Sequence, residues 1–109
     1  MGTLTGVNNT APVVRSGRLF DVAVEISTRN RIVLRQYHNS RSDSDFSRTA
    51  FDSEDELPQW VRDDIAVIKW LPEGVDCSLG RWEERSYNAY PILQVYQLHS
   101  PEAKERGMT

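Results

Sequence analysis

The sequence predicts an α+β fold in which a small antiparallel sheet of three to four strands carries one main helix, in the order strand, strand, helix, strand (ββαβ). Three observations predict this fold. Apolar and polar residues alternate from Phe20 to Ile26, an amphipathic stretch spans residues 57–71, and a mostly apolar run covers residues 90–98. A period of two indicates a half-buried strand, whereas an apolar stripe with helical spacing indicates a helix that packs on a sheet.

The length of 109 residues fits one domain. We expect an N-terminal arm at residues 1–17, a single α+β domain at residues 18–99 and a polar C-terminal tail at residues 100–109, with room for a short helical turn. The arm is rich in Gly, Asn and Thr, and its one candidate for a short edge strand is Pro12–Arg15.

Residues 18–38 predict a β-hairpin. The apolar positions of its two strands are Phe20, Val22, Val24 and Ile26, then Ile32, Val33, Leu34 and Tyr37. The segment Ser27–Asn30 supplies the turn, because Asn tolerates the left-handed backbone that hairpin turns need.

A polar and acidic connection is expected at residues 39–56. Phe46 and Phe51 are its only large apolar residues, and we expect them to pin the connection to the domain. A connection of this length is uncommon in a small domain and is usually functional or disordered, so its role stays open.

Residues 57–71 predict the helix. Pro58 suits its first turn, where a missing N–H breaks no hydrogen bond. Ser53 and Glu56 have the spacing of a capping box just upstream, and Pro72 with Gly74 ends the helix.

An irregular stretch is expected at residues 72–89, followed by a third strand at residues 90–98 with Pro91 at its beginning. This strand is apolar on both faces, which indicates a central strand or one buried on both sides. One helix covers only one face of such a sheet. The other face therefore needs a partner protein, a second copy or the protein's own loops.

The charge is unevenly distributed along the chain, although the net charge is only −3. Residues 1–41 hold six Arg against two acids, whereas residues 42–76 hold ten acids against three cationic residues. An acidic protein is not expected to be a dedicated nucleic-acid binder. Eleven of the thirteen cationic residues are Arg, which indicates either interface contacts or a GC-rich genome.

The sequence offers no recognisable catalytic or metal site. Its two histidines, His38 and His99, have no Cys or His nearby at the spacing of metal ligands. Cys77 is the only cysteine, and nothing beside it marks it as a nucleophile. The acidic run lacks the residue order of an EF-hand, and there is no Gly-rich phosphate loop. We therefore expect a protein that is not an enzyme and that uses no metal or cofactor.

Asp64 is the anomaly of the helix, because it lies near the centre of the apolar arc. A carboxylate in that position is costly unless it is hydrogen-bonded or paired. We expect a buried pair, a small pocket lined by Asp64, or a rotated stripe that leaves Asp64 at its edge. The candidate partners lie on strands that the helix should cross, and they are Arg31, Arg35, Tyr37 and Tyr96.

An aromatic and cationic interface is predicted at the end of the helix and beyond it. Its members are Trp70, Trp82, Arg81 and Arg85. Trp and Arg contribute most to the energy of protein interfaces, and Trp70 lies on the polar side of the last turn. The alternative is that the following loop folds back and covers Trp70 with Trp82 or Leu79.

The run Leu57–Gly74, LPQWVRDDIAVIKWLPEG, resembles a segment of small bacteriophage-encoded proteins that have no assigned activity. The resemblance covers this segment alone and carries no site residues. It implies a phage or prophage origin, and hence the host cytoplasm or a virion. No secretion signal and no membrane-spanning apolar run is recognisable in the sequence, which also predicts a cytoplasmic protein.

The sequence therefore favours a non-enzymatic interaction or structural accessory module that self-associates, with a dimer as the expected form. Its partner would be a second copy or another protein, with no membrane. One alternative is a small-ligand or nucleotide-binding protein with a pocket between sheet and helix. A second is a weak nucleic-acid binder that uses the Arg-rich hairpin, whose cationic and aromatic members are Arg29, Arg31, Arg35, Arg41 and Tyr37.

Overall fold

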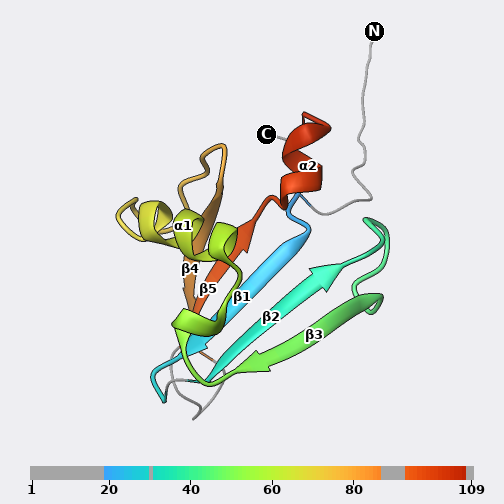
Figure 1. The fold of residues 1–109 in the computed structure, drawn as a ribbon. Helices are drawn as coiled ribbons and strands as arrows, with labels where there is room; N and C mark the ends of the chain where they lie inside the picture. The colour runs from blue at the N-terminus through green and yellow to red at the C-terminus, as the bar shows by residue number, and fades with distance from the viewer. Residues whose placement is uncertain (1–18, 30, 87–92, 108–109) are drawn as a thin grey trace, which may run out of the picture.

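The computed structural model describes residues 19–29, 31–86 and 93–107, which form a five-stranded antiparallel sheet with helices on one side (Figure 1). The strands lie in the order β3-β2-β1-β5-β4. The elements are β1 (Val22–Ser27), β2 (Ile32–Tyr37), β3 (Phe46–Phe51), the 3-10 helix η2 (Glu54–Glu56), α1 (Gln59–Ile68), β4 (Gly80–Arg85), β5 (Leu93–Leu98) and α2 (Pro101–Glu105).

The α+β class and the antiparallel sheet are confirmed, but the expected strand count and the ββαβ order are wrong. The chain runs βββαββα, because the expected connection at residues 39–56 contains β3 and the expected irregular stretch at residues 72–89 contains β4. Both are edge strands. An edge strand needs little apolar surface, so β3 (FSRTAF) and β4 (GRWEER) lack the alternation that marks β1.

The hairpin of β1 and β2 is confirmed, with Val24 opposite Leu34. The turn residue Asn30, the arm at residues 1–17 with Pro12–Arg15, and Pro91 lie outside the described residues. The closing strand is confirmed as β5, which lies between β1 and β4 and buries Val95 on one face and Leu98 on the other.

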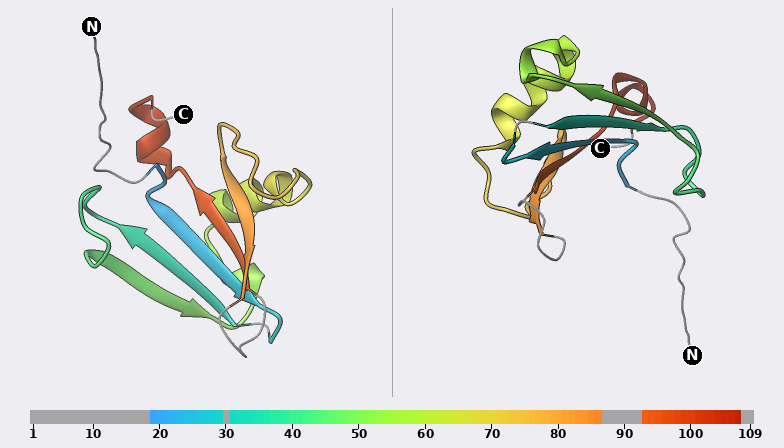
Figure 2. Two further views of the ribbon diagram at one scale, coloured as in Figure 1. Left: turned by 180° about the vertical axis from the view of Figure 1, so that it is seen from behind. Right: turned by 90° about the horizontal axis from the view of Figure 1, so that it is seen from below.

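The core lies between α1 and one face of the sheet (Figure 2). It consists of Val22, Val24 and Ile32 from β1 and β2, Leu57, Val61, Ile65 and Ile68 from α1 and its approach, and Tyr96 and Leu98 from β5. Residues of α1 at helical spacing meet strand residues at period two, so each element buries the face that its sequence pattern indicates.

The start of α1 differs in detail from the prediction. Ser53 makes no capping hydrogen bond with its side chain, because η2 comes between it and α1. The helix begins at Gln59 directly after Pro58. At the other end of the domain, Ser100 caps α2 by accepting a hydrogen bond from the Ala103 amide at 3.1 Å.

Candidate functional site

The face of the sheet opposite α1, called here the open face, carries no helix of the described chain (Figure 2). Alternation within the strands decides which side chains it presents. In register across the sheet these are Arg48, Arg35, Ala23, Gln97 and Arg81 in one row, and Ala50, Val33, Glu25, Val95 and Glu83 in the next. The open face is therefore rich in charged side chains in its middle as well as at its rim.

Ion pairs hold these charges in fixed positions. Arg35 contacts the Glu25 carboxylate on the neighbouring strand at 3.0 Å. Glu83 contacts two guanidinium groups, those of Arg81 at 3.2 Å and Arg85 at 2.9 Å. The members of these pairs are partly buried, so solvent screens them less than exposed surface pairs.

Small apolar residues lie beneath these charges and are buried although no helix covers them. Val95 is 1% exposed and Val33 is 6% exposed. Val95 lies in register between Glu25 and Glu83, and Arg81 is one of its diagonal neighbours. Because the stems of long charged side chains are apolar, they can cover such a floor while the charges stay in water.

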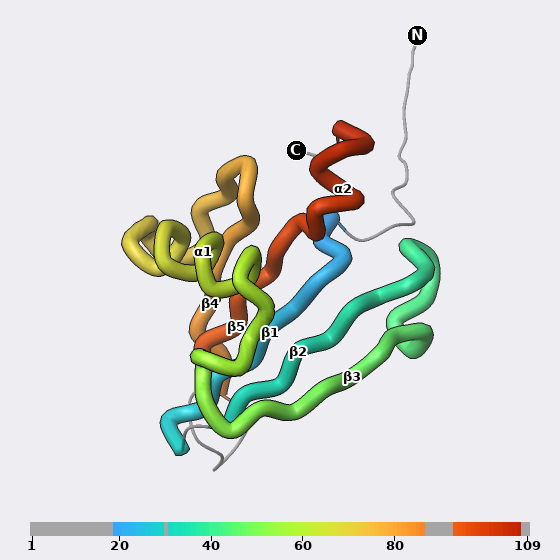
Figure 3. The backbone as a smooth tube through the Cα atoms, viewed as in Figure 1, coloured from blue at the N-terminus to red at the C-terminus, as the bar shows by residue number. Residues whose placement is uncertain are grey.

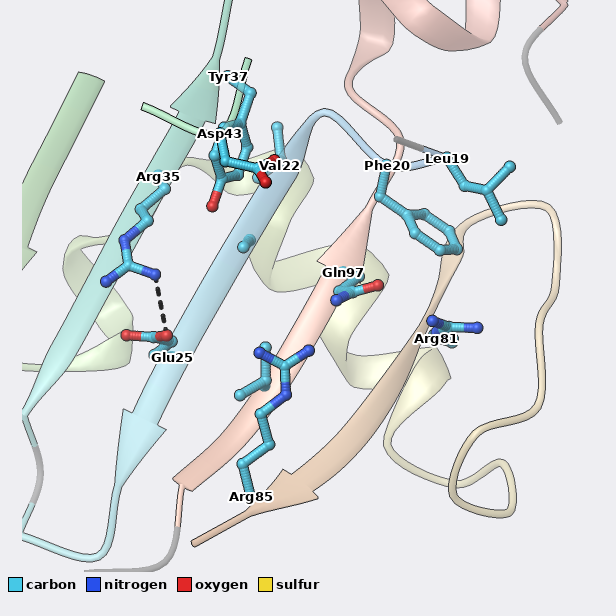
Figure 4. Close-up of a pocket in the computed structure, with 12 residues that line it drawn as sticks. Leu19, Phe20, Val22, Glu25, Arg35, Tyr37, Asp43, Arg81, Arg85 and Gln97 are labelled. Atoms are coloured by element: carbon cyan, nitrogen blue, oxygen red, sulfur yellow. Dashed lines mark hydrogen bonds and ion pairs between the residues drawn. The ribbon is translucent and has the colours of Figure 1, made fainter. Parts of the chain in front are cut away.

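A cavity of about 460 Å³ opens on this face (Figure 4). Its cationic and polar lining consists of Arg35, Arg81, Arg85, Tyr37, Gln97, Glu25 and Asp43. In Figure 4, Arg85 extends from β4 over β5, and Arg81 lies beside Phe20. The Nε atoms of Arg35 and Arg81 are buried and have no hydrogen-bond partner. The guanidinium groups that line the cavity are donors suited to an acidic or carbonyl-bearing group.

His99 and Phe20 close one end of the open face. Their rings lie 4.7 Å apart, and the Arg81 guanidinium lies 5.3 Å from the Phe20 ring centre. Burial lowers the pKa of the His99 imidazole, and Lys104 acts in the same direction, whereas the carboxylates of Asp21 and Asp76 oppose the shift. His99 is therefore favoured in its neutral form in the fold.

A second cavity, of about 500 Å³, lies at the β2–β3 end of the sheet. Three arginines line it, Arg29, Arg31 and Arg48, with Asp52 as the acidic residue. Within the described chain these arginines form no ion pair. This cavity keeps the cationic character that the sequence predicts for the hairpin, whereas Arg35 of the same hairpin is neutralised by Glu25.

The predicted partners of Asp64 are wrong. Asp64 is 7% exposed and accepts a hydrogen bond from Lys104 of α2 at 2.7 Å. Of the four candidates, Arg35 and Tyr37 line the open-face cavity and Arg31 lines the second cavity. Tyr96 lies in the core, and its hydroxyl donates to Gln94 at 3.4 Å. The helix crosses strands whose residues on that side are apolar, so the strand arginines face away from it.

The sequence predicts a pocket between sheet and helix, and the open-face cavity does not lie there. Side chains of α1 and of the sheet pack together in the expected position. The cavity instead lies on the other face, and Asp64 is not among its lining residues.

The predicted grouping of Trp70, Trp82, Arg81 and Arg85 does not form one surface. Trp70 is exposed, at 80%, so the alternative in which a loop covers it is wrong. Trp82 packs against the core, and its indole N–H donates to the Leu71 carbonyl at 2.6 Å. Arg81 and Arg85 alternate with Trp82 along β4 and therefore line the open face.

Sequence reasoning did not single out several residues of the open face, including Phe20, Glu25, Glu83 and Gln97. Glu25 was recognisable as a polar position of an alternating strand, and Glu83 stands between two arginines at period two. That period would have indicated a shared face if β4 had been recognised as a strand.

Three further findings concern chemistry and location. Among the residues that the structure describes, no group of three or more His, Cys, Asp and Glu side chains could hold a metal ion. Cys77 is a free thiol that is partly buried against the core. Within the same described ranges, none of the helices is long and apolar enough to cross a membrane.

Comparison of the chain with family models, with curated proteins and with solved structures finds no match in any of the three. The resemblance of Leu57–Gly74 to phage proteins thus stays a hypothesis, and function has to be argued from the site itself.

Proposed function

We propose that this protein is a non-enzymatic interaction module that contacts another protein through its open face. The observation that carries the proposal is the set of arginines on this face, held in place by Glu25 on the central strand β1 and by Glu83 on the edge strand β4, with no described helix over them. Structural surfaces without a role seldom require several partly buried charges side by side, since each charge loses part of its hydration.

The chemistry of the face suits protein recognition. Arg and aromatic residues are enriched in the cores of protein interfaces. Arg35 lies 5.5 Å from the ring centre of Phe46, and Arg81 stacks near Phe20. Because ion pairs already restrict these arginine side chains, they lose less conformational entropy on binding than unpaired arginines would.

The face also indicates the kind of complex. Its apolar floor is already shielded, so the protein does not need a partner in order to hide apolar surface. We infer a reversible complex in which an acidic or carbonyl-rich surface of the partner meets the arginines. Such a complex should associate faster at low salt, because opposite charges steer the encounter.

Site-specific photo-crosslinking in the native cell tests the proposal. A photoreactive residue replaces Gln97 on the open face, and a matched control replaces Ala66, which is exposed on α1. We expect the Gln97 variant to yield one defined protein adduct that the Ala66 variant does not give. Equal adducts from both positions, or none from Gln97, would contradict the proposal.

A second candidate function is the binding of a small anionic ligand in the open-face cavity. The three arginines that line the cavity, Arg35, Arg81 and Arg85, favour it. Inorganic phosphate and adenosine monophosphate should then raise the melting temperature by mass action, and Arg85→Ala should weaken that increase. No change with either compound at millimolar concentration would rule out this candidate for phosphate-bearing ligands.

The cationic cavity at Arg29, Arg31 and Arg48 keeps a weak nucleic-acid interaction as a third candidate. Binding of single-stranded oligonucleotides should then fall steeply as salt rises, because phosphate contacts release counterions. A gel shift that does not depend on salt would count against it. The phage origin is a separate proposal, which the genes on either side of this one would test.

A further inference from the structure

The sheet has two edge strands, β3 and β4, and their outer edges differ in whether other described residues make hydrogen bonds to them. An edge strand presents backbone N–H and C=O groups that another strand can pair with, and proteins usually block them. In an antiparallel pair, residues alternate between those bonded to the neighbouring strand and those that direct their backbone groups outward. The hydrogen bonds at the strand ends therefore identify the outward groups.

The loop that precedes β4 seals its outer edge. The His99 amide donates to the Leu79 carbonyl at 3.1 Å, so alternation directs the backbone groups of the even-numbered residues of β4 away from β5. Residues 73–77 make hydrogen bonds to outward groups of all three of these residues, Gly80, Trp82 and Glu84. Cys77 donates to the Gly80 carbonyl at 2.9 Å, Gly74 donates to the Trp82 carbonyl at 3.0 Å, and the Glu73 carboxylate accepts from the Glu84 amide at 2.8 Å.

The outer edge of β3 has no such cover. The His38 amide donates to the Asp45 carbonyl at 3.0 Å, so the same alternation directs the backbone groups of Phe46, Arg48 and Ala50 outward. Among the described residues, no group makes a hydrogen bond to these outward backbone atoms. In Figure 3, no described segment runs along the outer side of β3.

The sequence of β3 also lacks the usual blocking features. All six residues pair in continuous register with β2, so there is no bulge. The strand contains no proline, and Arg48 is its only charged residue. A strand of this length and regularity can accept a further strand.

We propose that β3 pairs in antiparallel fashion with β3 of a second copy, which joins two sheets into one of ten strands. A two-fold axis perpendicular to the sheet relates the copies, so each face of one sheet continues the same face of the other. Side chains that are directly opposite must share a face. Residues 46, 48 and 50 can therefore oppose only even-numbered residues of the second copy.

Charge and strand overlap together select the register, since an axis at Ala50 would pair only residues 49–51 of the strand. An axis at Arg48 would place two guanidinium groups directly opposite each other, which is unfavourable. An axis at Thr49 instead sets Arg48 opposite the small side chain of Ala50 of the second copy, with that copy's Asp52 and Arg48 as its two diagonal neighbours. The outward backbone groups of Arg48 and Ala50 then form hydrogen-bonded pairs on either side of the axis. The outward backbone groups of the strand are thus complementary to themselves, which favours a second copy as its partner.

The outward backbone groups of β3 take no part in the open-face cavity, whose lining includes no residue of β3, so either proposal can fail without the other. If both hold, the dimer places two open faces side by side on one large sheet. A partner with two acidic segments would then bind by avidity, because the second contact becomes intramolecular.

Proline at position 50 tests the pairing. The Ala50 amide points outward, so Ala50→Pro removes a donor to the second copy and no donor to β2. Light scattering over a range of concentrations should show dimers of the unmodified protein and monomers of Ala50→Pro, with Ala50→Thr as a matched control that stays dimeric. A monomeric unmodified protein, or a dimeric Ala50→Pro, would overturn the proposal.

Disulfide trapping gives a second readout that does not depend on the tolerance for proline. In a Cys77→Ala background, Thr49→Cys places two thiols directly opposite each other at the axis, where Cα atoms are about 4.5 Å apart and a disulfide can form. Ser47→Cys is the control, because its copies would lie roughly 13 Å apart along the strands. Mild oxidation should link Thr49→Cys and leave Ser47→Cys monomeric. Equal linking of both variants would show that this register is wrong.

Discussion

At the scale of single residues, the folded chain resolves the anomaly of Asp64 with a charge from a distant part of the sequence. The carboxylate lies at the edge of the core beneath α2, where Lys104 reaches it at 2.7 Å and also lies 5.6 Å from the Trp60 ring centre. Asp64 thus ties α2 to α1, because a buried carboxylate is stable only with a partner. Burial also disfavours a charged imidazole, so the neutral form of His99 is favoured where its ring packs against Phe20.

A double-mutant cycle checks the Asp64–Lys104 pair. Lys104→Ala leaves the carboxylate without its partner, and we expect a loss of roughly 1–3 kcal/mol in unfolding free energy, less than for a fully buried pair because Lys104 is partly exposed. Asp64→Leu in the same background should recover most of that loss. Urea denaturation measures both changes. If the two single losses simply add in the double variant, the pair is not coupled.

Acidification should destabilise the protein through His99. The pKa of His99 in the fold is lowered from 6.5, so the unfolded chain binds more protons than the folded chain as the pH falls below that value. The stability that neutral His99 contributes is complete above about pH 6.5 and is lost as the pH falls through the lowered pKa. Chemical denaturation at several pH values should show a smaller acid loss for His99→Gln than for the unmodified protein. Identical losses would mean that another group is responsible.

At the scale of elements, the hydrogen bonds between β4 and the loop before it depend on the backbone conformation of Gly80. Gly80 has a φ of +148°, and a Cβ at this position would lie 2.0 Å from the Gln97 carbonyl oxygen of β5. The close approach lets β4 pair with β5 on one side while its outward groups bond to residues 73–77 on the other. Gly is the residue that satisfies both demands.

Substitution of Gly80 should therefore be costly. We expect Gly80→Ala to lower the unfolding free energy by about 3 kcal/mol, from backbone strain and the forced displacement of β5. The matched control is Gly74→Ala, where φ is +81° but no atom lies within 4 Å of the new Cβ. The control should cost about 1–2 kcal/mol, from strain alone. Comparable losses in urea denaturation would show that contact with Gln97 is unimportant.

At the scale of the whole molecule, one layer of helices and one layer of charged side chains enclose the sheet. A single helix covers only one face, and the sequence left a partner, a second copy or loops as covers for the other. Within the described residues, the stems of paired Arg and Glu side chains stand over the apolar floor instead. The open face is consequently polar, and its ion pairs hold the charged side chains in fixed positions.

Truncation of Arg81 checks this shielding. Arg81→Ser removes the stem beside Phe20 and Val95, so apolar surface becomes accessible, whereas Arg81→Met keeps a stem of similar length without the charge. We expect binding of a hydrophobic dye to rise in Arg81→Ser and to change little in Arg81→Met. If both variants bind dye equally, the charge and not the stem protects the floor.

The sequence by itself determined the hairpin, the helix and the closing strand, because each buries a face whose apolar residues recur at the period of its own backbone. It also marked Asp64 as a charge in need of a partner, whereas it left open whether Trp70 is exposed or covered by the following loop. Only the tertiary structure decided the rest. Strands β3 and β4 form because the neighbouring strands β2 and β5 offer hydrogen bonds and a surface to pair with. Their own sequences contain few apolar residues, so the sequence pattern alone does not predict them as strands. Lys104 meets Asp64, and Arg35 meets Glu25, because the fold sets side by side residues that local periodicity cannot relate.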